Sequence, residues 1–353
     1  MPRAAADAPR WAFLDLLRGV AALAVVMQHG LEHVVPGFRD WSCRVFSPGQ
    51  FGVTLFLLIS GFIIPASLER SGSNSRFWMQ RVFRLFPLYW ATIAFYAIHC
   101  WTMDDWQPPQ AWQWLVNMTM LQEFCRVPAV SGVFWTLSLE LLFYATCSLC
   151  HALGWLRRAE RIAWLGQAGL FAAGVGIPLF LSRRVPGGFG FLFLTMFIGS
   201  LIYRFTTREV SGKHLGVQLL SLTAVALSVA YCCFAHLPRP GLAFSFQGVI
   251  ANWSIAYLAF FAGLWGRALA MPQAATYLGR ISYSLYLVHP CVILMLPGSW
   301  PPVAYLAALL TGTGAVASLT FRWIEEPSIQ FGKRWLSPRP AVGGVETSTT
   351  RAA

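Results

Sequence analysis

The sequence predicts an all-α membrane protein in which about ten transmembrane helices form one bundle. Three observations predict this fold class. Hydrophobic residues make up 56% of the 353-residue chain, charged residues make up only 11%, and the mean hydropathy is +0.55; a soluble domain normally carries about 25% charged residues. The apolar residues gather in windows long enough to span a bilayer. The basic residues between these windows are concentrated on alternate segments, as membrane topology requires.

Each predicted helix rests on an apolar window of about 20 residues, which is the length that crosses the hydrocarbon core of a bilayer. The windows are residues 11–30, 50–68, 85–103, 132–152, 161–181, 188–204, 215–235, 246–266, 277–296 and 302–323. An even number of spans places both termini on one side. We therefore expect a membrane-embedded domain over residues 11–330, a cytoplasmic N-terminal segment over 1–10, and a disordered cytoplasmic tail over 331–353.

The net charge of +12 is explained by topology, not by nucleic-acid binding. With the N-terminus inside, most of the 26 Lys and Arg residues fall on inner segments, and Arg18 falls within the first span. The predicted outer segments contain only Arg39, Arg44, Arg126, Arg183, Arg184 and Arg239. This positive-inside bias predicts that both termini are cytoplasmic. The sequence contains no basic, aromatic-interleaved soluble module of the kind that binds nucleic acids.

The first span, "WAFLDLLRGVAALAVVMQHG", carries Arg18 and His29 eleven residues apart. Eleven residues of α-helix turn through about 1100° and rise about 16 Å, so both side chains share one helix face. An arginine that faces lipid costs at least about 2.5 kcal/mol, and we therefore expect this face to point into the bundle. A simpler alternative stays open on these residues alone, in which Arg18 pairs with Asp15 and His29 sits at the outer interface.

Other spans carry polar groups that suit a buried site. The stretch "RVFRLFPLYW" places Arg81 and Arg84 on one helix face at the inner membrane boundary, where two guanidinium forks would recognise phosphate; ordinary topology-setting charge is the alternative. The stretch "WTLSLELLFY" buries Glu140 in a span, and an ionisable residue there is a candidate functional group. Two small residues, Ser60 and Gly61 in "FGVTLFLLISGFII", permit close helix approach.

The stretch "ISYSLYLVHP" adds His289 to the ninth predicted span. Pro290 follows it and frees a backbone carbonyl that a polar neighbour can satisfy, so we interpret His289 as structural. Asp15, Tyr144 and His289 are accordingly predicted to support the site, not to perform its chemistry.

Six stretches, in order, resemble the motifs of the membrane-bound acyltransferase family 3. They are "LDLLRGVAALAVVMQH", "FGVTLFLLISGFII", "RVFRLFPLYW", "WTLSLELLFY", "ISYSLYLVHP" and "FRWIEEP", and together they extend from residue 11 to about residue 330. The resemblance implies a protein of the bacterial cytoplasmic (inner) membrane. It also implies O-acylation of surface polysaccharide, lipopolysaccharide, peptidoglycan or an antibiotic, with acetyl-CoA or another acyl-CoA as the donor and no metal.

The resemblance assigns roles to single residues. Its arginine–histidine pair falls on Arg18 and His29, and its paired arginines fall on Arg81 and Arg84. The three arginines would hold the donor's phosphates, and Ser60 and Gly61 would line a passage for its pantetheine arm. His29 would act as the general base on a hydroxyl of a glycan, glycolipid or other acceptor. Direct transfer is favoured over an acyl-histidine intermediate, which stays open.

Two carboxylates compete to orient His29 in this scheme. Glu140 would bond to the second ring nitrogen and stabilise the imidazolium, as the acid of a catalytic triad does. Glu32 lies about one turn above His29 on the same predicted helix and is the rival for this role.

Two other function classes remain as alternatives. The literal motif "HGLEH", from His29 to His33, matches a zinc-peptidase pattern, but no convincing third ligand accompanies it, and the eight cysteines form no CxxC pair. A multi-span transporter of a polar or anionic substrate would also bury charged residues, although the sequence shows no internal repeat. Neither the oligomeric state nor a disulfide between outer cysteines follows from the sequence.

Overall fold

The computed structural model describes residues 11–102, 109–183, 185, 187–237 and 244–336. Every regular element within these ranges is helical, which confirms the predicted all-α class. The predicted N-terminal segment 1–10, residues 337–353 of the predicted tail, and the basic residues Arg184 and Arg239 lie outside the described residues. The first six residues of the tail segment, 331–336, are helical and end the last helix.

The elements follow one another without a strand in the described ranges. The α-helices are α1 (Ala12–Val34), α2 (Phe38–Arg44), α3 (Pro48–Ser71), α4 (Asn74–Thr102), α5 (Ala111–Met118), α6 (Trp135–Ala152), α7 (Ala159–Phe171), α8 (Ile177–Leu181), α9 (Gly187–Thr206), α10 (Gly212–Tyr231), α11 (Phe246–Trp265), α12 (Gln273–Arg280), α13 (Ser282–Met295), α14 (Pro302–Thr320) and α15 (Glu326–Leu336). Short 3-10 or π-helical turns join some of them, namely η1 (Leu156–Arg158), η2 (Ala172–Gly176), η3 (Cys232–His236), η4 (Gly266–Ala268) and η5 (Phe321–Glu325).

The number of apolar spans is lower than the predicted ten. Among the described residues, seven helical runs are long and apolar enough to cross a membrane, and the pair α12–α13, bent by 67°, makes an eighth if it counts as one span. Helices also form where the other two spans were predicted, as α4 and α6. These two are less apolar because they carry Arg81, Arg84 and Glu140, which line an internal cavity.

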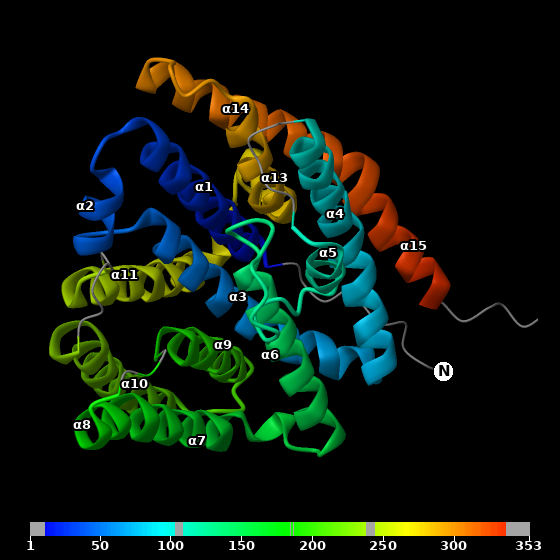
Figure 1. Ribbon diagram of the computed structural model, residues 1–353. Helices are drawn as coiled ribbons and strands as arrows, with labels where there is room; N and C mark the ends of the chain where they lie inside the picture. The colour runs from blue at the N-terminus through cyan, green and yellow to red at the C-terminus, as the bar shows by residue number, and fades with distance from the viewer. Residues whose placement is uncertain (1–10, 103–108, 184, 186, 238–243, 337–353) are drawn as a thin grey trace, which may run out of the picture.

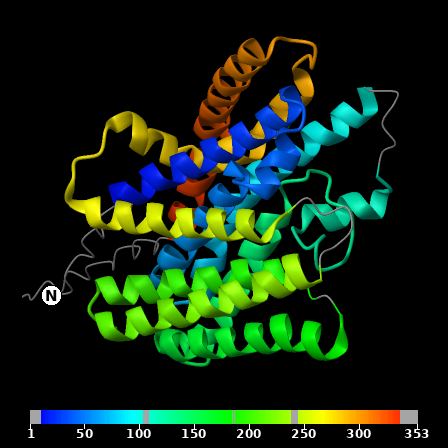
Figure 2. The same ribbon diagram turned by 90° about the vertical axis from the view of Figure 1, so that its left-hand side faces the viewer.

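Helices α1 and α3 lie at the centre of the bundle (Figure 1). Helix α3 packs against α1, α9 and α11, while α7, α8 and α10 form an outer layer beyond α9 (Figure 2). On the opposite side α1 contacts α12, α13 and α14, and α4 packs against α15. Together α14, η5 and α15 form one long helical run, from Pro302 to Leu336. The first and last thirds of the chain therefore meet around α1.

Glycines allow the central helices to touch through their backbones. A Cβ atom at Gly61 in α3 would overlap the main chain of α9 at Met196, and one at Gly199 in α9 would overlap the main chain of α3 at Leu58. The backbones can approach this closely only because both positions lack a side chain. We expected Gly61 to line the donor passage, but it packs against α9 instead. Ser60 and Gly61 are neighbours on a helix and so point about 100° apart.

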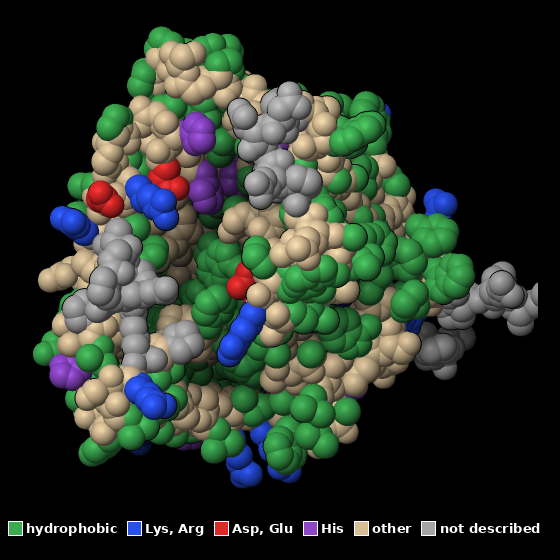
Figure 3. Space-filling model, in the orientation of Figure 1, with side chains coloured by type: hydrophobic (Ala, Val, Ile, Leu, Met, Phe, Trp, Pro, Cys, Tyr) green, Lys and Arg blue, Asp and Glu red, His purple; other side chains and the backbone are tan. Residues whose placement is uncertain are grey.

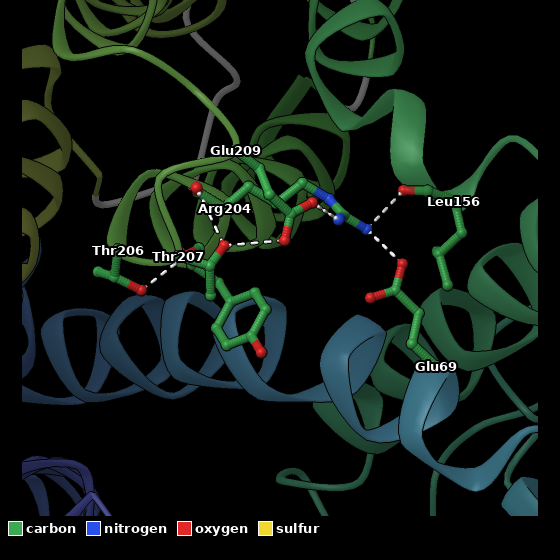
Figure 4. A network of polar contacts seen from close by, with 7 residues as sticks. Glu69, Leu156, Arg204, Thr206, Thr207 and Glu209 are labelled. Atoms are coloured by element: carbon green, nitrogen blue, oxygen red, sulfur yellow. Dashed lines mark hydrogen bonds and ion pairs between the residues drawn. The ribbon is translucent and has the colours of Figure 1, made fainter.

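A buried arginine joins three segments at the end of α9 (Figure 4). The guanidinium of Arg204, only 2% exposed, donates to Glu69 on α3 at 2.6 Å and to Glu209 after α9 at 2.6 Å. It also donates to the carbonyl of Leu156 at 3.0 Å. Because two carboxylates and a carbonyl surround it, its desolvation is offset, and the ends of α3 and α9 are held together.

Candidate active site

A narrow cavity lies between helices α1, α3, α4, α6 and α13, with a volume of about 80 Å³. Its walls combine apolar and polar side chains, and most of its charged groups are residues that the sequence singled out. The lining residues are Arg18, Val53, Phe56, Leu57, Ser60, Ile64, Arg81, Arg84, Leu85, Thr136, Leu137, Glu140, Tyr144, Ser282, Tyr283 and Tyr286. The fold thus brings together six of the predicted site residues from four helices.

Three arginines give this cavity a positive wall. Arg81 is 8% exposed, donates to the Ser67 hydroxyl at 2.7 Å, and lies over the rings of Phe77 and Tyr144. Its buried Nε has no hydrogen-bond partner in the described chain. The guanidinium groups of Arg18 and Arg84 donate no hydrogen bond to another described residue. Both arginines interact electrostatically with nearby carboxylates. Guanidinium donors that are left open in this way suit an anionic ligand.

Glu140 is the acidic counterpart of these arginines. Its Oε1 accepts a hydrogen bond from Ser60 at 3.0 Å and another from Tyr144 at 2.6 Å. Electrostatic attraction links Glu140 to Arg18. Arg18 is also attracted by Asp15, the partner that the simpler alternative gave it. Tyr144 thus contacts both the carboxylate of Glu140 and the guanidinium of Arg81.

Sequence reasoning missed a second carboxylate, Glu325, beside the same arginines. It is 2% exposed, accepts a hydrogen bond from the Ser284 hydroxyl at 2.7 Å, and interacts electrostatically with Arg84 and Arg18. The available signal was its place in "FRWIEEP", directly after an apolar span, because an acidic residue at membrane depth is costly unless it is paired.

His29 meets His289, not a carboxylate. The Nδ1 of His29 lies 3.1 Å from the Nε2 of His289, and the two rings stack with centroids 5.1 Å apart. His29 contacts α13 through His289, and Arg18 lines the cavity to which α13 also contributes side chains. Glu140 bonds instead to Ser60 and Tyr144, so the expectation that it holds the second nitrogen of His29 is corrected.

Glu32, the rival carboxylate, points to another neighbour. Its Oε1 accepts a hydrogen bond from Gln28 at 2.7 Å, and it acts on His29 only through its charge. The two histidines of "HGLEH" also separate, because His33 stacks against Tyr305 with ring centroids 5.8 Å apart while His29 contacts His289. His29, Glu32 and His33 thus each have a different partner.

One face of the molecule has a hollow next to several histidine side chains (Figure 3). Histidine side chains gather at its edge, hydrophobic side chains line its walls, and acidic and basic side chains lie close by. A partly exposed imidazole and an internal, arginine-lined cavity are thus built around the same helix, α1.

Comparison with known proteins decides the family. The sequence model of the acyltransferase domain family matches residues 11–324, nearly all of the described bundle. This chain belongs to that acyltransferase family. The match confirms the resemblance that the six motifs predicted. No solved structure matches this chain significantly.

Three relatives illustrate the range of proteins that this member of the family is similar to. Nodulation protein 10 of Rhizobium leguminosarum bv. viciae is 25% identical over 93% of this chain and 96% of its own. Acyltransferase MdmB of Streptomyces mycarofaciens is 27% identical over 48% of this chain and 46% of its own. The O-acetyl transferase of Shigella phage Sf6 is 30% identical over 37% of this chain and 43% of its own. The match therefore spans less than half the length of the last two relatives.

Proposed function

We propose that this acyltransferase is an integral-membrane O-acyltransferase that moves an acetyl group from acetyl-CoA to a hydroxyl of a glycan or glycolipid. In this proposal the donor enters from the cytoplasm, both termini are cytoplasmic, and the membrane is the bacterial cytoplasmic membrane. The family membership supports acyl transfer. The observation that carries the rest is the arginine-lined cavity, in which Arg18 and Arg84 have no hydrogen-bonded partner among the described residues.

The cavity fits the chemistry of the donor. Arg18, Arg81 and Arg84 offer guanidinium donors that match phosphate oxygens. A volume of about 80 Å³ is too small for a nucleotide, so the phosphates would bind at the cationic mouth and only the thin thioester arm would enter. Ser60, Thr136 and Tyr286 line the way from the arginines toward α13. When bound, the thioester supplies an activated acyl carbon.

His29 would act on the acceptor. Its ring would take the proton of the acceptor hydroxyl as the new C–O bond forms and the C–S bond breaks. The imidazolium would then return the proton to the departing thiolate, which yields the ester and a free thiol. An imidazole suits this exchange because its ordinary pKa lies near physiological pH. Direct transfer needs one such cycle, and we favour it over an acyl-histidine intermediate.

The acceptor is proposed from chemistry and from relatives. The partly exposed His29 lies about 16 Å above Arg18 along α1, so a hydroxyl could approach it from the opposite side of the membrane to the donor. One relative is named an O-acetyl transferase and another a nodulation protein. A glycan hydroxyl is consistent with both names.

The test uses the full chain purified in lipid nanodiscs, with acetyl-CoA as donor and octyl glucoside as a model glycolipid acceptor. We expect acetyl-CoA to raise the thermal stability, and we expect thiol release together with an acetylated glucoside detected by mass spectrometry. His29→Ala should abolish transfer but keep the stabilisation by acetyl-CoA. Full transfer by His29→Ala would remove His29 from the chemistry, and uptake of a solute into vesicles without acetyl-CoA would favour a transporter.

A further inference from the structure

His289 is fully buried between α13 and α1, and both of its ring nitrogens are engaged. Its Nδ1 lies 2.8 Å from the carbonyl oxygen of Tyr286 and 3.3 Å from that of Leu285. Its Nε2 lies 3.1 Å from the Nδ1 of His29. A histidine that served only to fill space would not need this particular set of partners.

These contacts fix where the protons are. A carbonyl oxygen only accepts hydrogen bonds, so the Nδ1 of His289 carries a proton. A neutral imidazole has a single N–H, and the Nε2 of His289 is then an acceptor. The Nδ1 of His29 must therefore donate to it. The remaining nitrogen of His29, Nε2, is left with a free lone pair.

We propose that His289 is a positioning residue that accepts the Nδ1–H of His29, so that Nε2 of His29 is the base. The inference rests on the proposed function, which makes His29 the general base. When Nε2 takes a proton, the hydrogen bond from Nδ1 to His289 becomes charge-assisted and stabilises the imidazolium. His289 thus has the place that a carboxylate occupies in a catalytic triad, but as a neutral imidazole.

The position of His289 is set from a third helix. The hydroxyl of Tyr286, one turn before His289, donates to the carbonyl of Val133 at 2.9 Å and lies 2.7 Å from the Thr136 hydroxyl. These bonds tie α13 to the N-terminal end of α6. The same Tyr286 supplies the carbonyl that fixes the ring of His289. A continuous series of hydrogen bonds therefore runs from α6 through Tyr286 and His289 to His29.

Two variants that differ mainly in reach test the proposal. In His289→Gln the side-chain amide can extend to the former Nε2 position and accept from His29. In His289→Asn the amide reaches only the former Nδ1 position and cannot. With acetyl-CoA and octyl glucoside, we expect Gln to keep kcat within about tenfold of the unmodified chain and Asn to lower kcat about 10²- to 10⁴-fold. The KM for acetyl-CoA should not change in either, and equal activity of the two variants would overturn the proposal.

A second measurement does not depend on the acceptor. The ¹⁵N spectrum of the histidine-labelled chain, with His29 assigned by the loss of its signals in His29→Gln, should show a proton on Nδ1 and none on Nε2 at neutral pH. A proton on Nε2 would overturn the inference. If His29→Ala retains transfer, the proposed function is wrong in making His29 the general base. If His29→Ala is inactive but His289→Asn is fully active, only the role of His289 fails.

Discussion

Ser60 on α3 donates a hydrogen bond to Glu140 on α6, and the 3.0 Å contact joins two helices through the wall of the cavity. Tyr144, one turn along α6, donates to the same carboxylate oxygen at 2.6 Å. The carboxylate therefore satisfies two hydroxyl groups and faces the arginines at the same time. Glu140 thus connects α3 to α6 and also supplies the negative charge in the lining of the cavity.

Glu140→Ala should lower stability, because the Ser60 and Tyr144 hydroxyl groups lose their acceptor inside the bundle. Each buried donor without a partner costs about 1–3 kcal/mol. Thermal unfolding of the detergent-solubilised chain measures the loss. Glu140→Gln is the matched control, since its amide oxygen can accept the same two bonds and should unfold close to the unmodified chain. Equal losses of thermal stability in both variants would mean that the charge of Glu140, not its hydrogen bonds, stabilises the contact between α3 and α6.

Gly61→Ala should destabilise the central helix pair, because the new methyl group would meet the main chain of α9 at Met196. Backbone cannot move aside as a flexible side chain can, and such overpacking costs about 1–3 kcal/mol or more. The melting temperature and the fraction of monodisperse protein measure the effect. Gly216→Ala on α10 is the control, because nothing lies within 4 Å of that position. It should be neutral or slightly stabilising, and a harmless Gly61→Ala would disprove the close backbone contact.

Glu209 should make stability depend on acid. Burial tends to raise the pKa of this carboxyl, but hydrogen bonds from Thr207 and Arg204 and the charge of Arg204 outweigh it and lower the pKa below its ordinary value. A carboxyl with a lowered folded-state pKa adds stability above its unfolded-state pKa of about 4.3. That contribution is lost as the pH falls through the folded-state pKa.

Melting temperatures between about pH 3 and pH 6 test this dependence. The unmodified chain should lose stability toward low pH more steeply than Glu209→Gln. Glu160→Gln serves as the control, since Glu160 is partly exposed and its carboxylate lies 3.6 Å from His214, and it should leave the slope nearly unchanged. Identical slopes for Glu209→Gln and the unmodified chain would show that the ion pair between Glu209 and Arg204 makes no pH-dependent contribution to stability.

Arg84→Lys should weaken the binding of CoA by about tenfold or more. Lysine keeps the charge but loses the planar fork, and a hydrogen bond to a charged group contributes about 1.5–3 kcal/mol. Equilibrium binding of CoA to the purified chain measures the change. Arg76→Lys on the same helix is the control, because Arg76 is exposed and bonds to the carbonyl of Leu336. Unchanged affinity in Arg84→Lys would leave the cavity arginines with a topological role only.

Much of the helical arrangement could be predicted from hydrophobicity alone. Every predicted apolar window falls on helical residues, although the window 277–296 is divided between α12 and α13, because a largely apolar run of about 20 residues has few alternatives in a bilayer. The count of apolar spans was too high because α4 and α6 turn charged residues toward the cavity. The 67° bend between α12 and α13 also escaped prediction. The bend lies next to Gly279, which packs against the main chain of Asp15. This tertiary contact cannot be predicted from a local sequence pattern.

The sequence indicated which residues gather at the cavity better than it indicated which of them contact one another. Arg18, Ser60, Arg81, Arg84 and Glu140 do line one cavity. Their partners depend on how each helix is rotated about its axis, and this rotation is set by packing between distant segments. For that reason Glu140 was matched to the wrong neighbour, and the sequence could not show that His289 meets His29.

The two imidazoles that touch each other are separated by 260 positions in the chain. During synthesis the first helix leaves the ribosome long before the helix that carries His289, and chains generally acquire structure from the N-terminus onward. A nascent chain that has not yet inserted α13 therefore lacks one member of the pair, however well its earlier helices are packed. Competence for chemistry would arise late in biogenesis, when the last third of the polypeptide docks onto the first.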